Sequence, residues 1–179
     1  HSMPPHFRIL SQTVYARTAQ KVNHMKLLVL SDTHRSLGFA YEAIETESPD
    51  AVAHLGDHLS DAEDLSFAFQ QTEFYYVPGN CDYELAARQS LLLELDGVRV
   101  FLTHGHLFGV KSGLDTLAAA AKDMGAQLAL FGHTHQALLE ERNGVTLLNP
   151  GAAGRFGSSS YAVVELANGK FSCQLKTEQ

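Results

Sequence analysis

Five short groups of polar residues recur along the chain, and each directly follows an apolar run. They are Asp32-Thr33-His34, Gly56-Asp57, Gly79-Asn80, His104-Gly105-His106 and Gly132-His133-Thr134-His135. Carboxylate, carboxamide and imidazole side chains together suit divalent ions such as Mn²⁺, Fe²⁺, Ni²⁺ or Zn²⁺, whereas thiolate-rich and all-oxygen sets suit other sites. The residue types therefore predict a metal site.

The number of candidate ligands points to more than one ion. Seven side chains could bind metal: Asp32, His34, Asp57, Asn80, His104, His133 and His135. A single ion needs fewer ligands. Two ions about 3.5 to 4 Å apart that share one carboxylate would use all seven and leave positions open for water and substrate. Each group alone is weak evidence, because Gly-Asp is usually a turn, but five groups in this order are specific.

The apolar runs that precede these groups alternate with helical patterns from Met25 onward. We expect strands over 26–31, 51–55, 73–77 and 127–131, and helices over 37–48, 61–70 and 112–124, the last with Ser112 as its N-cap. Asp96-Gly97, Asn143-Gly144 and Asn168-Gly169 predict the turns of three hairpins. Parallel βαβ units followed by hairpins predict an α/β fold, a four-layer αββα sandwich of two mixed β-sheets flanked by helices. The polar groups would then converge at the carboxyl ends of the strands.

Length and composition predict one domain. The chain has 179 residues, of which 45% are hydrophobic, enough for one sizeable core. We assign residues 25–179 to this domain. Residues 1–24 show no lasting periodicity and begin with His1-Ser2-Met3, which resembles a tag remnant. We interpret them as tag remnant and a loosely ordered arm, or as an upstream start that the domain does not need.

The net charge and the cysteine content limit which binding partners and which cellular compartment we expect. The formal net charge is −7, and no basic run could follow a phosphate backbone, so we do not expect nucleic acid as a partner. No apolar stretch is long enough for a membrane span. Cys81 and Cys173 do not suggest a disulfide framework, which favours the cytoplasm. Strand edges could support a homo-oligomer such as a dimer.

The ordered set Asp-x-His, Gly-Asp, Gly-Asn, His-Gly-His and Gly-His-x-His resembles the calcineurin-like metallophosphoesterase superfamily from Met25 onward. The small size, Gly-Asn-Cys-Asp and Thr-His-Gly-His resemble its single-domain bacterial and archaeal phosphodiesterases of the YfcE type. The resemblance implies the αββα fold and a binuclear site. It places Asp32, His34 and His135 on one metal, Asn80, His104 and His133 on the other, and Asp57 between them.

The resemblance also implies an activity, hydrolysis of a small phosphodiester by a hydroxide that bridges two divalent metals, with Mn²⁺ as the expected activator. Asn80 would donate a hydrogen bond to a phosphate oxygen. Within the enzyme class, a phosphomonoesterase and a nuclease remain alternatives, and the acidic composition disfavours the nuclease. Outside the enzyme class, the alternative is a non-catalytic protein-binding scaffold of the same fold. All seven ligand positions are filled by the expected residue types, which disfavours this alternative.

One position departs from the wider superfamily. Many members carry histidine after the Gly-Asn pair, where it is thought to assist the leaving group, and this chain has Cys81. A thiol with a reference pKa of about 8.5 is a poorer proton donor in this geometry. We therefore expect a preference for good leaving groups, or assistance from His106, or from His58 beside the bridging carboxylate.

Overall fold

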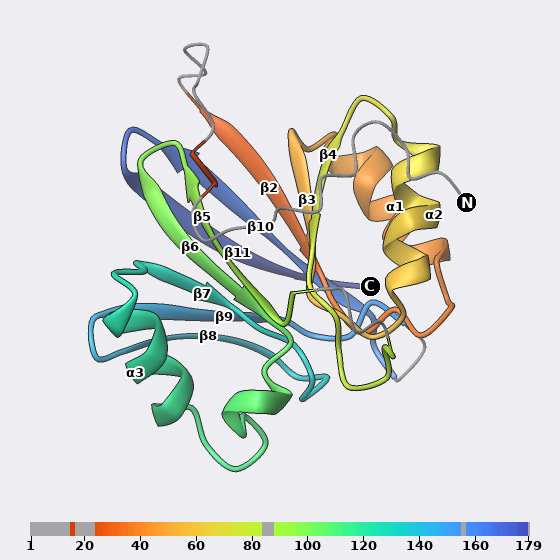
Figure 1. Ribbon diagram of the computed structural model, residues 1–179. Helices are drawn as coiled ribbons and strands as arrows, with labels where there is room; N and C mark the ends of the chain where they lie inside the picture. The colour runs from red at the N-terminus through yellow and green to blue at the C-terminus, as the bar shows by residue number, and fades with distance from the viewer. Residues whose placement is uncertain (1–14, 17–23, 84–87, 155–156, 179) are drawn as a thin grey trace.

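Two mixed β-sheets pack face to face, with helices on both outer faces (Figure 1). The computed structural model describes residues 15–16, 24–83, 88–154 and 157–178. The predicted αββα sandwich is confirmed. Most of the predicted N-terminal arm, residues 1–14 and 17–23, lies outside the described residues. Within that stretch, β1 (Tyr15–Ala16) pairs in parallel with β5.

The five-stranded sheet has the order β11-β10-β2-β3-β4. Its strands are β2 (Met25–Leu30), β3 (Ala51–His54), β4 (Glu73–Tyr76), β10 (Ser160–Ala167) and β11 (Lys170–Thr177). The strands β2, β3 and β4 are parallel, and Leu30, His54 and Tyr76 lie side by side at their carboxyl ends. The three loops that follow therefore leave from the same edge of the sheet.

The six-stranded sheet has the order β1-β5-β6-β7-β9-β8. Its longer strands are β5 (Ser90–Leu95), β6 (Val98–Thr103), β7 (Leu128–Leu130), β8 (Ala137–Arg142) and β9 (Val145–Pro150). The strands β6, β7 and β9 are parallel, with Leu102, Leu130 and Leu148 in register. The loops after β6 and β7 therefore also start next to each other.

Three helices cover the sheets, and a short 3₁₀ helix lies beside them. The helices α1 (Gly38–Glu47) and α2 (Leu59–Ala68) pack on the outer face of the five-stranded sheet, where Ile44 and Leu65 join one buried cluster. The helix α3 (Asp115–Asp123) packs Leu117 on the outer face of the other sheet. The 3₁₀ helix η1 (His106–Phe108) follows β6 and was not predicted.

A third cluster fills the space between the sheets. Its side chains come from alternate positions of the strands, such as Leu27 and Val29 in β2 and Leu102 in β6, all fully buried. Burial of a leucine or valine side chain contributes about 1.5 to 3 kcal/mol. This cluster fixes the two sheets against each other, and thereby the two sets of loops. None of the helices in the described ranges is long and apolar enough to cross a membrane.

The predictions for the hairpin turns are confirmed, but the predicted start of one helix is wrong. All three hairpin turns have the predicted left-handed residues, for example φ 54° at Asn143 and 78° at Gly144. The prediction that Ser112 caps a helix is wrong. The helix begins at Asp115, and its N-cap residue Leu114 makes no side-chain capping bond. Ser112 instead donates its backbone N–H to Gly109 in the preceding turn, so the chain is not yet helical there.

One buried carboxylate joins α1 to the last two strands. Glu47 is 7% exposed and accepts hydrogen bonds from Tyr161 Oη at 2.8 Å and Lys176 Nζ at 2.5 Å. Burial raises the pKa of Glu47, but the bonds from Lys176 and Tyr161 outweigh burial and leave the pKa below its ordinary value. The folded state therefore favours the charged form.

Candidate metal centre

All seven predicted ligands follow strand ends that meet at one edge of the sandwich. Asp32 and His34 follow β2, Asp57 follows β3, Asn80 follows β4, His104 follows β6, and His133 and His135 follow β7. Backbone bonds tie neighbouring loops together, from the Asp32 N–H to Gly56 O at 3.1 Å and from the Gly132 N–H to His104 O at 3.0 Å. The His133 N–H donates to Asp32 Oδ2 and so joins the loops of the two sheets.

Four of the predicted ligands form a tight group. One ligand atom from each of Asp32, His34, Asp57 and His135 lies within 4.8 Å of all the others. His135 Nε2 is 3.2 Å from Asp32 Oδ1, and His34 Nε2 is 3.3 Å from Asp57 Oδ2. Two carboxylates and two imidazoles at such distances offer a ligand set for one divalent cation.

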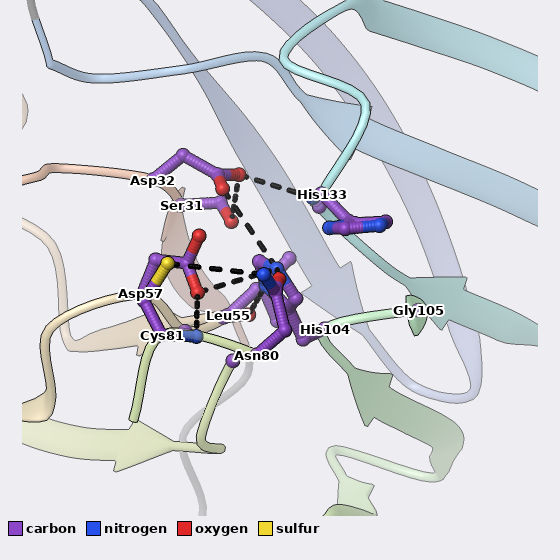
Figure 2. Close-up of polar contacts among 12 residues, drawn as sticks. Ser31, Asp32, Leu55, Asp57, Asn80, Cys81, His104, Gly105 and His133 are labelled. Atoms are coloured by element: carbon purple, nitrogen blue, oxygen red, sulfur yellow. Dashed lines mark hydrogen bonds and ion pairs between the residues drawn. The ribbon is translucent and has the colours of Figure 1, made fainter. Parts of the chain in front are cut away.

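A second group lies on the other side of Asp57. His104 Nε2 is 3.5 Å from Asp57 Oδ1 and 3.0 Å from Asn80 Oδ1. The ring of His133 lies beside that of His104, with centroids 5.0 Å apart. Figure 2 shows how Asp32, Asp57, Asn80, His104 and His133 converge. Asp57 therefore touches both groups.

The hydrogen bonds of His104 prepare its Nε2 for a metal. Nδ1 lies 2.7 Å from Leu55 O, and because a carbonyl only accepts, Nδ1 carries the proton. Burial lowers the pKa of His104, which keeps the ring neutral. The Nε2 lone pair then faces oxygens of Asn80, Asp57 and Asp32. Acceptors facing one another repel, and a cation among them removes this repulsion. The donor set therefore fits a bound metal ion.

Asp32 provides a second test of fit. It is fully buried, and its Oδ2 accepts hydrogen bonds from Ser31 Oγ at 2.6 Å and the His133 N–H at 3.1 Å. Its Oδ1 is buried and accepts no hydrogen bond from the described residues. Burial, more than the nearby charge of Asp57, raises the pKa of Asp32. A buried carboxylate oxygen that faces histidines without a hydrogen bond is suited to a cation.

Comparison with known proteins gives this centre its context. The sequence signature of the calcineurin-like phosphoesterase superfamily domain matches residues 25–169. The chain belongs to this superfamily. It is 32% identical to the probable metallophosphoesterase YsnB of Bacillus subtilis over 154 residues, which cover 80% of this chain and 86% of YsnB. It is 31% identical to the phosphodiesterase YfcE of Escherichia coli K12, covering 72% and 79% of the two chains.

Solved structures show the same architecture. A predicted phosphoesterase from Streptococcus pneumoniae superposes with a TM-score of 0.71 at 27% identity, covering 86% of this chain and 90% of that one. A Vps29 variant from Entamoeba histolytica gives a TM-score of 0.70 at 19% identity, covering 87% and 100%. The second likeness concerns the fold alone. Membership in the superfamily and the named relatives identify the chain as a phosphoester hydrolase of a family that uses divalent metal.

Both further histidines predicted to act lie beside the candidate metal centre. His58 is the N-cap residue of α2, and its ring contacts that of His34 with centroids 5.2 Å apart. His106 opens η1, and its ring lies 5.4 Å from that of His104 and 6.0 Å from that of His133. The two histidines thus flank opposite groups of ligands.

Cys81 lies within the candidate metal centre as well. Its N–H donates to Asp57 Oδ1 at 3.1 Å, and its Sγ is 3.8 Å from Asn80 Nδ2. Burial and the charge of Asp57 raise the pKa of the Cys81 thiol. Asp82 holds the loop by accepting hydrogen bonds from the N–H groups of Leu59 and Gly79, both at 2.8 Å.

Five of the seven candidate ligands adopt a left-handed backbone conformation, which residues with a side chain rarely adopt. Positive φ angles occur at Asp32 (55°), His34 (44°), Asp57 (59°), His133 (69°) and His135 (59°). Left-handed conformation costs a residue with a Cβ atom about 1 to 2 kcal/mol. Strained backbone persists where surrounding contacts enforce it, and it clusters at functional sites. Contacts around these loops must therefore supply the restraint.

Sequence reasoning missed the polar residues that supply part of this restraint. Thr33 and His54 are fully buried, and Asp61 is 3% exposed. Burial lowers the pKa of His54 to about 4, so its ring is neutral. The only sequence signal for Thr33 is its position between two candidate ligands. Asp61 lies in α2 among other acidic residues and shows no signal that separates it from them.

Proposed function

We propose that the protein is a binuclear metal-dependent phosphodiesterase that hydrolyses small phosphodiesters. The observation that carries the proposal is the arrangement of seven ligand side chains in two groups that share Asp57. Asp32, His34 and His135 would hold one ion, and Asn80, His104 and His133 the other. The relatives named as phosphodiesterases support a diester over a monoester as substrate.

The ligand chemistry supports Mn²⁺ or a similar divalent ion. Mixed imidazole, carboxylate and carboxamide donors suit borderline first-row metals. When bound, two such ions lower the pKa of a water molecule and screen the charge of the phosphate. Asp57 is suited to the bridging position because His104 and His34 approach different oxygens of its carboxylate.

The remaining chemistry belongs to Asn80 and to side chains around the ligands. The Asn80 amide directs Oδ1 toward His104, which leaves the N–H₂ group to donate to a non-bridging phosphate oxygen as charge builds there. The Cys81 thiol, whose pKa is raised, is a weak proton donor. Substrates whose leaving group needs little protonation should therefore react fastest, unless His58 or His106 supplies the proton.

Turnover of reporter esters by metal-stripped protein tests the proposal. Bis(para-nitrophenyl) phosphate and para-nitrophenyl phosphate would be assayed during titration with Mn²⁺, Ni²⁺, Zn²⁺ and Mg²⁺. We expect metal-dependent turnover, higher for the diester, and a loss of about 100-fold or more in kcat for Asn80→Ala. Gln174→Ala removes an exposed carboxamide from β11, distant in sequence from every ligand, and should change nothing. Absence of metal-dependent turnover, or an Asn80→Ala enzyme as fast as the native one, would overturn the proposal.

A further inference from the structure

Three polar side chains are buried directly behind the candidate metal centre and bind no substrate or metal in the proposed function. Thr33 lies between the ligands Asp32 and His34, His54 is the last residue of β3, and Asp61 lies in the first turn of α2. Thr33 and His54 are fully buried, and Asp61 is 3% exposed. Burying a carboxylate, an imidazole and a hydroxyl together is unfavourable unless their hydrogen bonds are satisfied.

These three side chains form a continuous hydrogen-bonded chain. Thr33 Oγ1 donates to Asp61 Oδ2 at 2.6 Å, and Thr33 Oγ1 lies 3.0 Å from His54 Nε2. At the other end of the imidazole, the Gly56 N–H donates to His54 Nδ1 at 3.3 Å. The Arg35 N–H donates to the same oxygen of Asp61 at 2.8 Å.

The donors and acceptors in this chain fix one tautomer of His54. Thr33 has a single hydroxyl proton, which it gives to Asp61. Its oxygen can then only accept from His54, so the proton of the neutral ring is on Nε2. That tautomer leaves Nδ1 as the acceptor that the Gly56 N–H requires. Every bond in the chain is thus consistent with one arrangement of protons.

The chain connects the two loops that carry three of the candidate ligands. Thr33 and Arg35 belong to the loop of Asp32 and His34, while Gly56 precedes Asp57. Asp32, His34, Arg35, Asp57 and His58 all have positive φ angles. The hydrogen-bonded chain runs between these two strained loops and reaches α2, which packs on the sheet. It therefore supplies restraint where the backbone conformation is least favourable.

We propose that Thr33, His54 and Asp61 act as positioning residues that hold the loops of Asp32, His34 and Asp57 in the conformation that binds metal. The proposal rests on the proposed function only in its kinetic part, because its first consequence is metal affinity. Outer residues that orient metal ligands change metal affinity or activity by about 10- to 100-fold when they are replaced. A purely structural role would change stability and leave affinity unaltered.

Variants of Thr33 test this role because valine keeps the shape of threonine and removes only the hydroxyl. Mn²⁺ affinity would be measured by calorimetry, kcat and KM with bis(para-nitrophenyl) phosphate at saturating Mn²⁺, and stability by thermal unfolding without metal. We expect Thr33→Val to weaken Mn²⁺ binding and lower kcat by about tenfold each, with KM within about twofold of native. Thr33→Ser, which keeps the hydroxyl, should stay within about twofold of native in Mn²⁺ affinity, kcat and KM. Asp61→Asn should show the same losses of Mn²⁺ affinity and kcat as Thr33→Val. It replaces Thr33→Val as the test if Thr33→Val does not fold.

A spectroscopic readout and a matched control make the test independent of activity. Imidazole ¹⁵N NMR of the native protein without metal should show His54 protonated on Nε2, and Thr33→Val should change this signal. Ser66→Ala removes another buried hydroxyl, from the helix of Asp61, and this hydroxyl donates to Glu63 O within α2. It should lose some stability and keep native Mn²⁺ affinity.

The outcomes separate the positioning role from the proposed activity. A Thr33→Val protein with native Mn²⁺ affinity and kcat, or an equal loss of affinity in Ser66→Ala, would overturn the positioning role while the phosphodiesterase assignment stands. A native protein that binds Mn²⁺ without turnover would overturn the activity, and weaker binding by Thr33→Val would still support positioning. A native protein that does not bind Mn²⁺ would overturn both.

Discussion

Replacing Asp32 by asparagine separates the stability of the metal-free protein from the stabilisation that metal provides. In the metal-free state Asp32 is a fully buried carboxylate, and burial raises its pKa. Asparagine has the same shape. Its Oδ1 can accept the hydrogen bonds from Ser31 Oγ and the His133 N–H. Its N–H₂ group can donate to His135 Nε2, which in the native protein lies 3.2 Å from a carboxylate oxygen of Asp32. We therefore expect metal-free Asp32→Asn to be at least as stable as native protein.

The metal-dependent part should behave in the opposite way. A ligand present at 100 times its Kd stabilises the folded state by about 2.7 kcal/mol. In a chain of this size, that raises Tm by about 5 to 11 °C. If losing the Asp32 carboxylate weakens binding 100-fold, the same Mn²⁺ concentration contributes only about 0.4 kcal/mol, and Tm rises by about 1 to 2 °C.

Calorimetric melts of native and variant protein, each with and without Mn²⁺, measure both effects. Asp50→Asn is the control because the Asp50 carboxylate also accepts a backbone N–H, from Lys26 at 2.8 Å, but lies before β3 rather than after it. Its melting temperature should rise with Mn²⁺ as in the native protein. A full native shift in Asp32→Asn would refute the assignment of Asp32 as a ligand. Metal-free variant protein less stable than native by more than about 1 kcal/mol would refute the argument that the buried carboxylate is unfavourable without metal.

Two further predictions concern the pH dependence of stability and the leaving group. Because the pKa of Glu47 in the folded protein is below its ordinary value of 4.5, its charge stabilises the fold above that pH and ceases to do so as the pH falls through the folded-state pKa. Glu47→Gln should therefore lower the free energy of unfolding in urea by about 1 to 3 kcal/mol at pH 7, with a difference that closes in acid, while the exposed-site variant Glu45→Gln should match native throughout. Cys81→His should raise kcat/KM for alkyl relative to aryl phosphodiesters by about 100-fold, because an imidazolium donates a proton more readily than a thiol whose pKa is raised; Cys173→Ala should leave that ratio unchanged. An unchanged ratio in Cys81→His would exclude position 81 from leaving-group chemistry.

The arrangement of the candidate ligands could be anticipated because each lies within a few residues of a strand end. Asp32 follows β2 by two residues and Asp57 follows β3 by three, so local apolar patterns suffice to place them. The three hairpin turns were likewise local, since Asp-Gly and Asn-Gly pairs accept left-handed conformation. Local signals thus gave both the elements and the edge at which the ligands meet.

The relation between distant segments could not be anticipated in the same way. The hairpin of β10 and β11 pairs with β2, whereas the other two hairpins join the second sheet. The bond from the His133 N–H to Asp32 Oδ2 spans 101 positions of sequence and depends on how the sheets pack. The misplaced start of α3 has a similar cause, because the turn at Gly109 and Ser112 outweighs the capping preference of serine.

The least predictable feature is the left-handed backbone at the ligands themselves. Positive φ is uncommon for any residue with a side chain, even for histidine, which adopts it more often than most, so no sequence rule would propose it at His34, His133 and His135 together. It is stable only because tertiary contacts enforce it, among them the bonds of Thr33 and Asp61. Strained loops and a buried, repulsive set of acceptors both lower the stability of the metal-free protein. Metal binding relieves the repulsion, and this is why substitutions at the centre should affect stability in opposite directions with and without Mn²⁺.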